Sequence, residues 1–120
     1  MTFIKHLKKL RDNYIINQVE NAKLPKFKGS PFIRRRLIFS GRVQKVGFRF
    51  ELYLMAKRLG LSGWVKNRDD KSVEAEIQGQ EEKIDFLTEF MKSLIRISVR
   101  KVEVTEIPIV KDEDSFILVK

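Results

Sequence analysis

Residues 35–59 read RRLIFSGRVQKVGFRFELYLMAKRL and contain the clearest change of pattern in the chain. The continuous apolar run at 37–39 predicts a strand over Arg35–Ser40. Glycines bound the next segment, Gly41–Gly47, which we expect to be a loop. Apolar residues then return at three- and four-residue steps, so Phe48–Leu59 is expected to be a helix. Strand, loop and helix therefore follow one another within 25 residues.

The pattern continues to the end of the chain. Working outward, we expect a strand at Trp64–Asn67, a polar turn at 68–71, a strand around Val73–Ile77, a helix over Glu81–Leu94, a strand through Val102 and Val104 that ends near Pro108, and a short last strand at Phe116–Val119. The order is β-α-β-β-α-β with one further strand. It predicts an α+β fold of the ferredoxin-like βαββαβ sandwich type, with two helices packed on one face of an antiparallel sheet.

The N-terminal quarter has a different composition. Residues 1–33 carry seven Lys or Arg and two acidic residues, and we interpret them as a basic N-terminal helix plus linker before a compact domain at 34–120. Phe3, Leu7, Leu10 and Tyr14 form the apolar stripe of the expected helical extension. This stripe predicts packing on the domain or on a second copy, which would give a homo-oligomer. Association with a membrane surface is the alternative, because the helix is also basic.

Composition excludes several kinds of chemistry. The 120 residues include no cysteine and one histidine, so thiolate catalysis, a His-based triad and a Cys- or His-rich metal site cannot be built. We expect no cofactor and no metal. The net charge of +9 favours anionic partners. No apolar run is long enough for a membrane span and the start lacks an apolar signal segment, so a cytoplasmic location is expected.

The loop before the first domain helix has the composition of an anion site. The first N–H groups of a helix lack backbone partners, and the helix dipole adds positive charge there. Arg49 falls in the first turn of this helix, where a cation is unfavourable unless an anion binds beside it. From spacing alone, a solvated Arg49 and two turn-forming glycines explain the pattern better than an anion site does, because glycine-rich turns between a strand and a helix are common.

Two segments resemble the signatures of the acylphosphatase family. Gly41-Arg42-Val43-Gln44-Lys45-Val46-Gly47-Phe48-Arg49 is similar to the family pattern G-R-V-Q-G-V-x-F-R, and Gly63-Trp64-Val65-Lys66-Asn67 is similar to G-W-V-x-N. Asn67 follows Arg49 by eighteen residues, as in the family. The resemblance covers about 34–120. It implies metal-independent hydrolysis of the carboxyl–phosphate bond of small-molecule acyl phosphates.

The resemblance also assigns roles. It implies that Arg49 binds the phosphoryl group and that Asn67 orients the attacking water. The phosphate-binding loop would be formed by Gln44, Lys45, Val46, Gly47, Phe48 and Arg49. The family has glycine where this chain has Lys45. If the backbone there has a positive φ, lysine costs on the order of 1–2 kcal/mol; otherwise its charge simply adds to the site.

Two other classes of function stay open at this stage. The first is an RNA-binding RRM-like module, which shares the fold, and Lys45–Phe50 partly resembles the aromatic motif of such modules. In an RRM, however, that motif lies on a central strand. We therefore expect no nucleic-acid partner. A non-catalytic phosphate-ligand-binding module is the other alternative. Asn67 alone would suit a turn. Trp64 is expected to pack in the core, as are Phe48 and Phe116.

Overall fold

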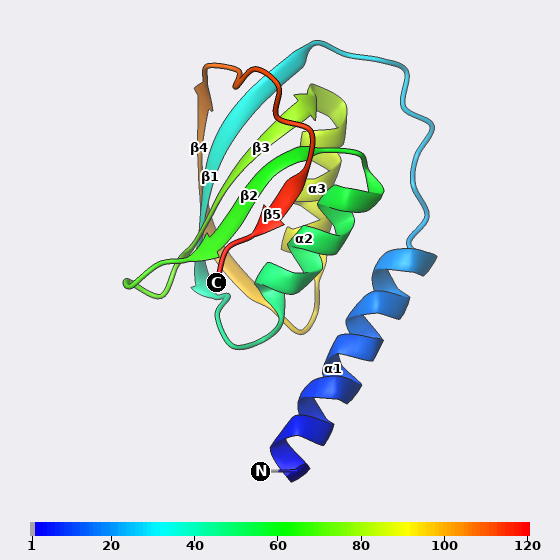
Figure 1. Cartoon of the computed structure of the whole chain (residues 1–120), viewed down its shortest axis with the longest axis vertical. Coiled ribbons are helices and arrows are strands. Elements are labelled where there is room, and N and C mark those ends of the chain that lie inside the picture. Colours follow the sequence, from blue (N-terminus) through cyan, green and yellow to red (C-terminus); the bar gives the residue numbers. More distant parts are fainter. Residues whose placement is uncertain (1) are drawn as a thin grey trace.

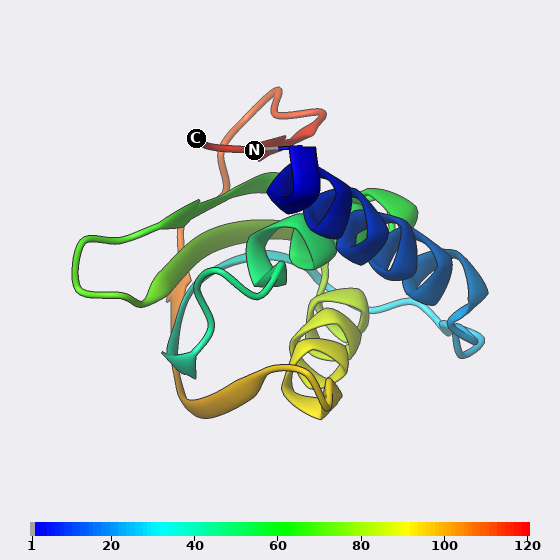
Figure 2. The same cartoon turned by 90° about the horizontal axis from the view of Figure 1, so that it is seen from below.

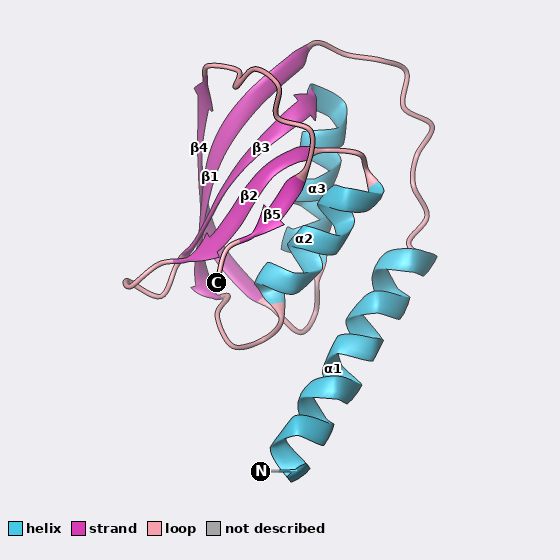
Figure 3. Cartoon of the chain, in the orientation of Figure 1, coloured by secondary structure: helices cyan, strands magenta, loops and turns pink. Residues whose placement is uncertain are grey.

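The computed structural model describes residues 2–120, and its element order confirms the predicted pattern. The elements are α1 (Thr2–Asn21), β1 (Phe32–Arg42), α2 (Phe48–Arg58), β2 (Ser62–Asn67), β3 (Val73–Gln80), α3 (Glu81–Ser93), β4 (Ser98–Ile107) and β5 (Phe116–Leu118). Figure 1 shows the domain helices behind one twisted sheet, with α1 outside them, and Figure 3 distinguishes helices from strands. The expected ferredoxin-like order is therefore present.

The sheet has five strands in the order β4-β1-β3-β2-β5. The four long strands pair antiparallel, as predicted, whereas β5 pairs parallel to β2, so the sheet is mixed. This difference arises because β4 and β5 lie on opposite edges, and residues 108–115 carry the chain across the end of the sheet between them. The Gln78 side-chain amide holds that crossing, since it accepts from the Val110 N–H (2.8 Å) and donates to the Val110 carbonyl (3.0 Å).

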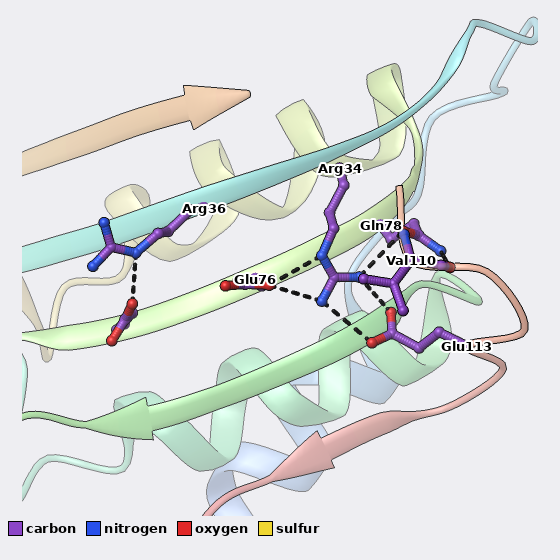
Figure 4. Close-up of polar contacts among 7 residues, drawn as sticks. Arg34, Arg36, Glu76, Gln78, Val110 and Glu113 are labelled. Carbon is purple, nitrogen blue, oxygen red and sulfur yellow. Dashed lines mark hydrogen bonds and ion pairs between the residues drawn. The ribbon is translucent and has the colours of Figure 1, made fainter. Parts of the chain in front are cut away.

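One face of the sheet is covered and the other is polar. Seen from below, α2 and α3 lie on the same face (Figure 2), and the core between helices and sheet includes Leu37, Phe39 and Ile77, all at most 1% exposed. Alternate residues of β1 and β3 point to the opposite face, as the period of a strand requires. There Arg34, 2% exposed, forms ion pairs with Glu76 (2.9 Å) and Glu113 (2.7 Å) (Figure 4).

The same alternation corrects the expectation for Trp64. Val65 of β2 is fully buried beneath the helices, so its neighbour Trp64 points to the polar face and is only half-buried. The Lys66 ammonium lies 5.3 Å from the centre of the indole ring. The predicted core positions of Phe48 and Phe116 are confirmed, with 1% and 6% exposure.

The segment between α1 and β1 is held along the domain. β1 begins at Phe32, three residues earlier than predicted, because Phe32 pairs with Gln80 of β3. The Pro31 carbonyl accepts from the Glu81 N–H (3.0 Å), and Ser30 Oγ accepts from the Glu82 N–H (3.0 Å). These bonds satisfy two of the free N–H groups at the start of α3.

The apolar stripe predicted for α1 does not face the domain. Phe3, Leu7, Leu10 and Tyr14 are 49–71% exposed, whereas Ile15 and Val19, which lie off that stripe, are buried. Residues 11, 15 and 19 repeat at four-residue steps and form the docking face. Packing of the helix on its own domain is thus present, but through a different face. The helices described in residues 2–120, α1 included, are too short or too polar to cross a bilayer.

Candidate active site

The loop between β1 and α2 begins at an irregularity of the strand. The pairing of β1 with β4 shifts between Ser40 and Gly41, and Gly41 has a φ of 124°. A β-carbon at Gly41 would collide with the Ser98 carbonyl and lie 2.8 Å from the Arg100 nitrogen, so a side chain cannot be accommodated. This close approach lets the chain leave the sheet and turn toward the start of α2.

Six consecutive N–H groups of this loop have no partner among residues 2–120. In the described chain, the backbone nitrogens of residues 44–49 donate to neither backbone nor side-chain acceptors. Gly47 precedes the first turn of α2 and no side chain caps this helix. Free N–H groups at the positive end of a helix dipole are suited to bind an anion.

The backbone at Lys45 is left-handed, with a φ of 64°. The loop therefore has, at this position, the conformation for which the family uses glycine. With lysine there, the folded protein is less stable by about 1–2 kcal/mol. The Lys45 side chain is exposed and lines the cavity described below. Both consequences considered for this residue, strain and added charge, thus occur together.

Two side chains tie the loop to neighbouring turns. Gln44 Nε2 donates to the carbonyls of Arg68 and Ser72, both at 2.8 Å, which fixes the loop to the turn after β2. On the other side, Arg96 Nε donates to the Val46 carbonyl (2.9 Å) and its Nη2 donates to Glu51 (2.6 Å). Such bonds at both ends preorganise the free N–H groups.

Glu51 belongs to the second of these ties and is fully buried. Burial raises the pKa of the Glu51 carboxyl above its ordinary value, and the hydrogen bond and charge of Arg96 act in the opposite direction. One carboxyl oxygen is paired with Arg96, whereas Oε2 has no partner among the described residues. The first turn of α2 therefore contains a carboxylate whose charge is costly.

Arg49 is held by the C-terminal strand. Its Nη1 donates to the Val119 carbonyl at 2.8 Å, just beyond β5. Among residues 2–120 this is the one hydrogen bond of the side chain, so the other guanidinium donors remain available for bidentate binding of phosphate oxygens. The sequence predicted this last strand but not its parallel pairing with β2, and that pairing at the sheet edge positions the arginine.

Asn67 is the last residue of β2, and its side chain is exposed. Asn67 and Arg49 line the same cavity of about 740 Å³. Among the predicted loop residues, Lys45, Gly47 and Phe48 line it as well, whereas Gln44 and Val46 do not and instead hold the loop in place. The wall also has an apolar part, which is formed by Val43, Phe50, Tyr53, Phe116, Ile117 and Leu118.

Three residues of α1 complete the lining. Lys8, Arg11 and Asp12 face the cavity opposite the domain residues, and Lys120 adds another cation. Nothing in the sequence singled out Arg11, because it lay off the predicted apolar stripe. No group of three or more His, Cys, Asp or Glu side chains that could hold a metal ion occurs in residues 2–120.

Comparisons with known proteins agree on one family, and the match of the family model begins after α1. The sequence model of the family described as Acylphosphatase matches residues 35–118. The chain is 57% identical over 60 residues to an acylphosphatase of Picrophilus torridus, covering 50% of this chain and 74% of the relative. It is 40% identical over 81 residues to one of Bifidobacterium longum, covering 67% and 84%. The crystal structure of acylphosphatase from Bacillus subtilis superposes with a TM-score of 0.69 at 36% identity, covering 73% of this chain and 99% of that one.

Proposed function

The chain belongs to the acylphosphatase family, and from this premise we propose that Arg49 and the N–H groups of residues 44–49 bind the phosphoryl group while Asn67 orients the attacking water. The activity is the hydrolysis of acyl phosphates. The residue roles rest on one observation above all: the loop whose N–H groups lack partners among residues 2–120 contributes Lys45, Gly47, Phe48 and Arg49 to the cavity that Asn67 also lines.

The chemistry suits these residues. Water attacks phosphorus in line with the bond to the acyl oxygen; that bond breaks, a carboxylate leaves, and the proton from water remains with orthophosphate. Because the carboxylate is a good leaving group, the reaction mainly requires stabilisation of charge on the phosphoryl oxygens and a correctly placed water. Arg49 and the loop amides supply the first. The Asn67 amide oxygen can accept a hydrogen bond from the water and so fix its direction.

The test is hydrolysis of benzoyl phosphate in EDTA by the wild type, Arg49→Ala and Asn67→Ala. Arg42→Ala and Asp69→Ala are the matched controls, since both residues are exposed and neither lines the cavity. We expect turnover in EDTA that falls on the order of a hundredfold or more in each site variant and less than threefold in the controls. Absence of wild-type turnover above background, or site variants as active as their controls, would overturn the proposed roles.

RNA binding has less support than hydrolysis. The segment Lys45–Phe50 lies in the loop and first turn of α2, whereas an RRM places its stacking aromatics on central strands. The polar face of the central strands carries ion pairs of Arg34 and Arg36 with acidic side chains (Figure 4). Binding of single-stranded RNA in a salt titration is the measurement that would revive this alternative.

Three further expectations belong to the same proposal. We propose that 34–120 is the acylphosphatase-like domain and 1–33 a basic helix plus linker, which is supported by the family match at residues 35–118. The exposed Phe3, Leu7 and Leu10 support a homo-oligomer through α1, which sedimentation would test. A cytoplasmic location is compatible with a cysteine-free chain, and cell fractionation would test it.

A further inference from the structure

The α1 helix lies outside the family match, yet it is seated directly on the phosphate loop. Ile15 is fully buried, and a β-carbon placed on Gly47 would collide with its Cδ1. At the other end, Arg58 of α2 donates to the carbonyls of Val19 and Ala22, both at 2.6 Å, and so holds the last turn of α1. Gly47 is therefore both the residue that α1 contacts and the residue that precedes the first turn of α2.

The contact of α1 with the loop places charged side chains at the cavity. The cavity is lined by five cationic side chains and one carboxylate. Three of the five cations come from α1 or the end of the chain: Lys8, Arg11 and Lys120. The carboxylate is Asp12. Such an excess of one sign around a concave site concentrates anions there.

Arg11 is the charged α1 residue that lies beside the phosphate loop, next to Ile15. A β-carbon on Gly47 would lie 3.4 Å from Arg11 Nε, beside the free N–H groups that begin α2. Nε is shielded from solvent and has no acceptor among the described residues. Within the part of the chain that the structure describes, the side chain has one polar contact, from Nη2 to Asp12 at 3.4 Å, which is long for a charged hydrogen bond.

A guanidinium in this position lacks compensation from the protein. It lies at the positive end of α2, in the same cavity as Arg49 and Lys45, and its ion pair with Asp12 is weak. An anion bound by the loop would supply the missing acceptor and offset the repulsion among these cations. The phosphoryl group of the substrate is such an anion, since the proposed function places it at the same N–H groups.

We propose that α1 completes the active site and that Arg11 is a substrate-binding residue that contacts the phosphoryl group. This inference rests on the proposed function and adds a second arginine, from outside the family match, to its phosphate site. Because the contact exists in both the bound substrate and the transition state, it contributes to binding more than to turnover. Orthophosphate, the product, is bound by the same contact.

The experiment compares Arg11→Gln, Arg11→Lys and Lys9→Gln in the full chain. Lys9 lies two residues earlier on α1, is exposed and does not line the cavity, so its variant controls for loss of one charge. For Arg11→Gln we expect a rise of about tenfold in both the KM for benzoyl phosphate and the inhibition constant of orthophosphate, with kcat changed less than threefold. In Arg11→Lys we expect a smaller rise of both constants, and in Lys9→Gln we expect neither constant to change.

The outcomes separate this inference from the proposed function. Circular dichroism and the melting temperature establish that each variant is folded before kinetics are compared. If the wild type is active and Arg49→Ala is not, but Arg11→Gln behaves like Lys9→Gln, the role of Arg11 is wrong and the site stands without it. An orthophosphate inhibition constant that does not move in Arg11→Gln also overturns it. If instead the proposed function itself is wrong, the wild type is inactive.

Discussion

Replacement of Lys45 by glycine should stabilise the protein while weakening its hold on substrate. Lys45 has a φ of 64°, where a side chain costs about 1–2 kcal/mol, and glycine removes that strain. Glycine also increases the conformational entropy of the unfolded chain, which reduces the gain in stability by about 0.4–1 kcal/mol. The net gain is about 0.5–1 kcal/mol. With an unfolding entropy of about 2.1 cal/mol/K per residue, the melting temperature of this chain should rise about 2–4 °C.

A matched variant separates strain from charge. Lys71 also has a positive φ, 75°, and is also exposed, but it does not line the 740 Å³ cavity. Lys71→Gly should therefore give a similar rise in melting temperature with an unchanged KM. Lys45→Gly should in addition raise the KM for benzoyl phosphate about threefold at low salt, with a smaller effect at high salt because the side chain is exposed.

The assays are thermal unfolding followed by circular dichroism and steady-state hydrolysis at two ionic strengths. A lower melting temperature for Lys45→Gly, with the expected rise for Lys71→Gly, would refute the view that the loop stores strain at this lysine. Equal KM values for the wild type and Lys45→Gly at low salt would refute its contribution to substrate attraction.

Three other predictions concern the supports of the site. Gln44→Ala removes two hydrogen bonds that hold the loop, so unfolding by urea should show a loss of about 1–2 kcal/mol, together with a lower kcat. Arg34→Met leaves two carboxylates on the polar face without their arginine; we expect a loss of about 3 kcal/mol by the same assay and unchanged kcat below the lowered melting temperature. For Glu51, burial raises the pKa in the folded state, so the folded protein retains a proton that the unfolded chain has released. The free energy of unfolding of the wild type relative to Glu51→Gln should thus fall as pH rises above the ordinary carboxyl pKa of 4.5 and level off above the raised value; a difference that grows with pH contradicts this.

The sequence was sufficient for the local structure of the domain. Alternation at Val73, Ala75 and Ile77 and the helical spacing of Ile84, Leu87 and Met91 correctly identified buried faces, since all six residues are fully buried. These patterns are informative because the period of an element and the burial of one of its faces are both local properties. The two signature segments likewise fixed the family, because their residues and separation are read directly from the chain.

Period alone does not say which face meets a neighbour. The stripe through Leu7 and Leu10 is a real helical face, but α1 docks through Ile15 and Val19, because the crossing of α1 over α2 at Gly47 selects the residues that point inward. The expectation that Trp64 packs in the core was likewise wrong, because the pairing of β2 with β3 assigns this side chain to the polar face of the sheet.

The set of residues that lines the cavity was also determined by the tertiary structure. The sequence named Arg49 and Asn67, and the tertiary structure brought them to one cavity and supplied their supports from distant segments: the Val119 carbonyl, the Arg96 side chain and Arg11 of α1. Each of these contacts joins residues at least thirty positions apart, so no local pattern encodes it. Local periodicity and the two signature segments determined the elements and the family of this protein, whereas long-range packing determined which side chains surround the cavity of Arg49 and Asn67.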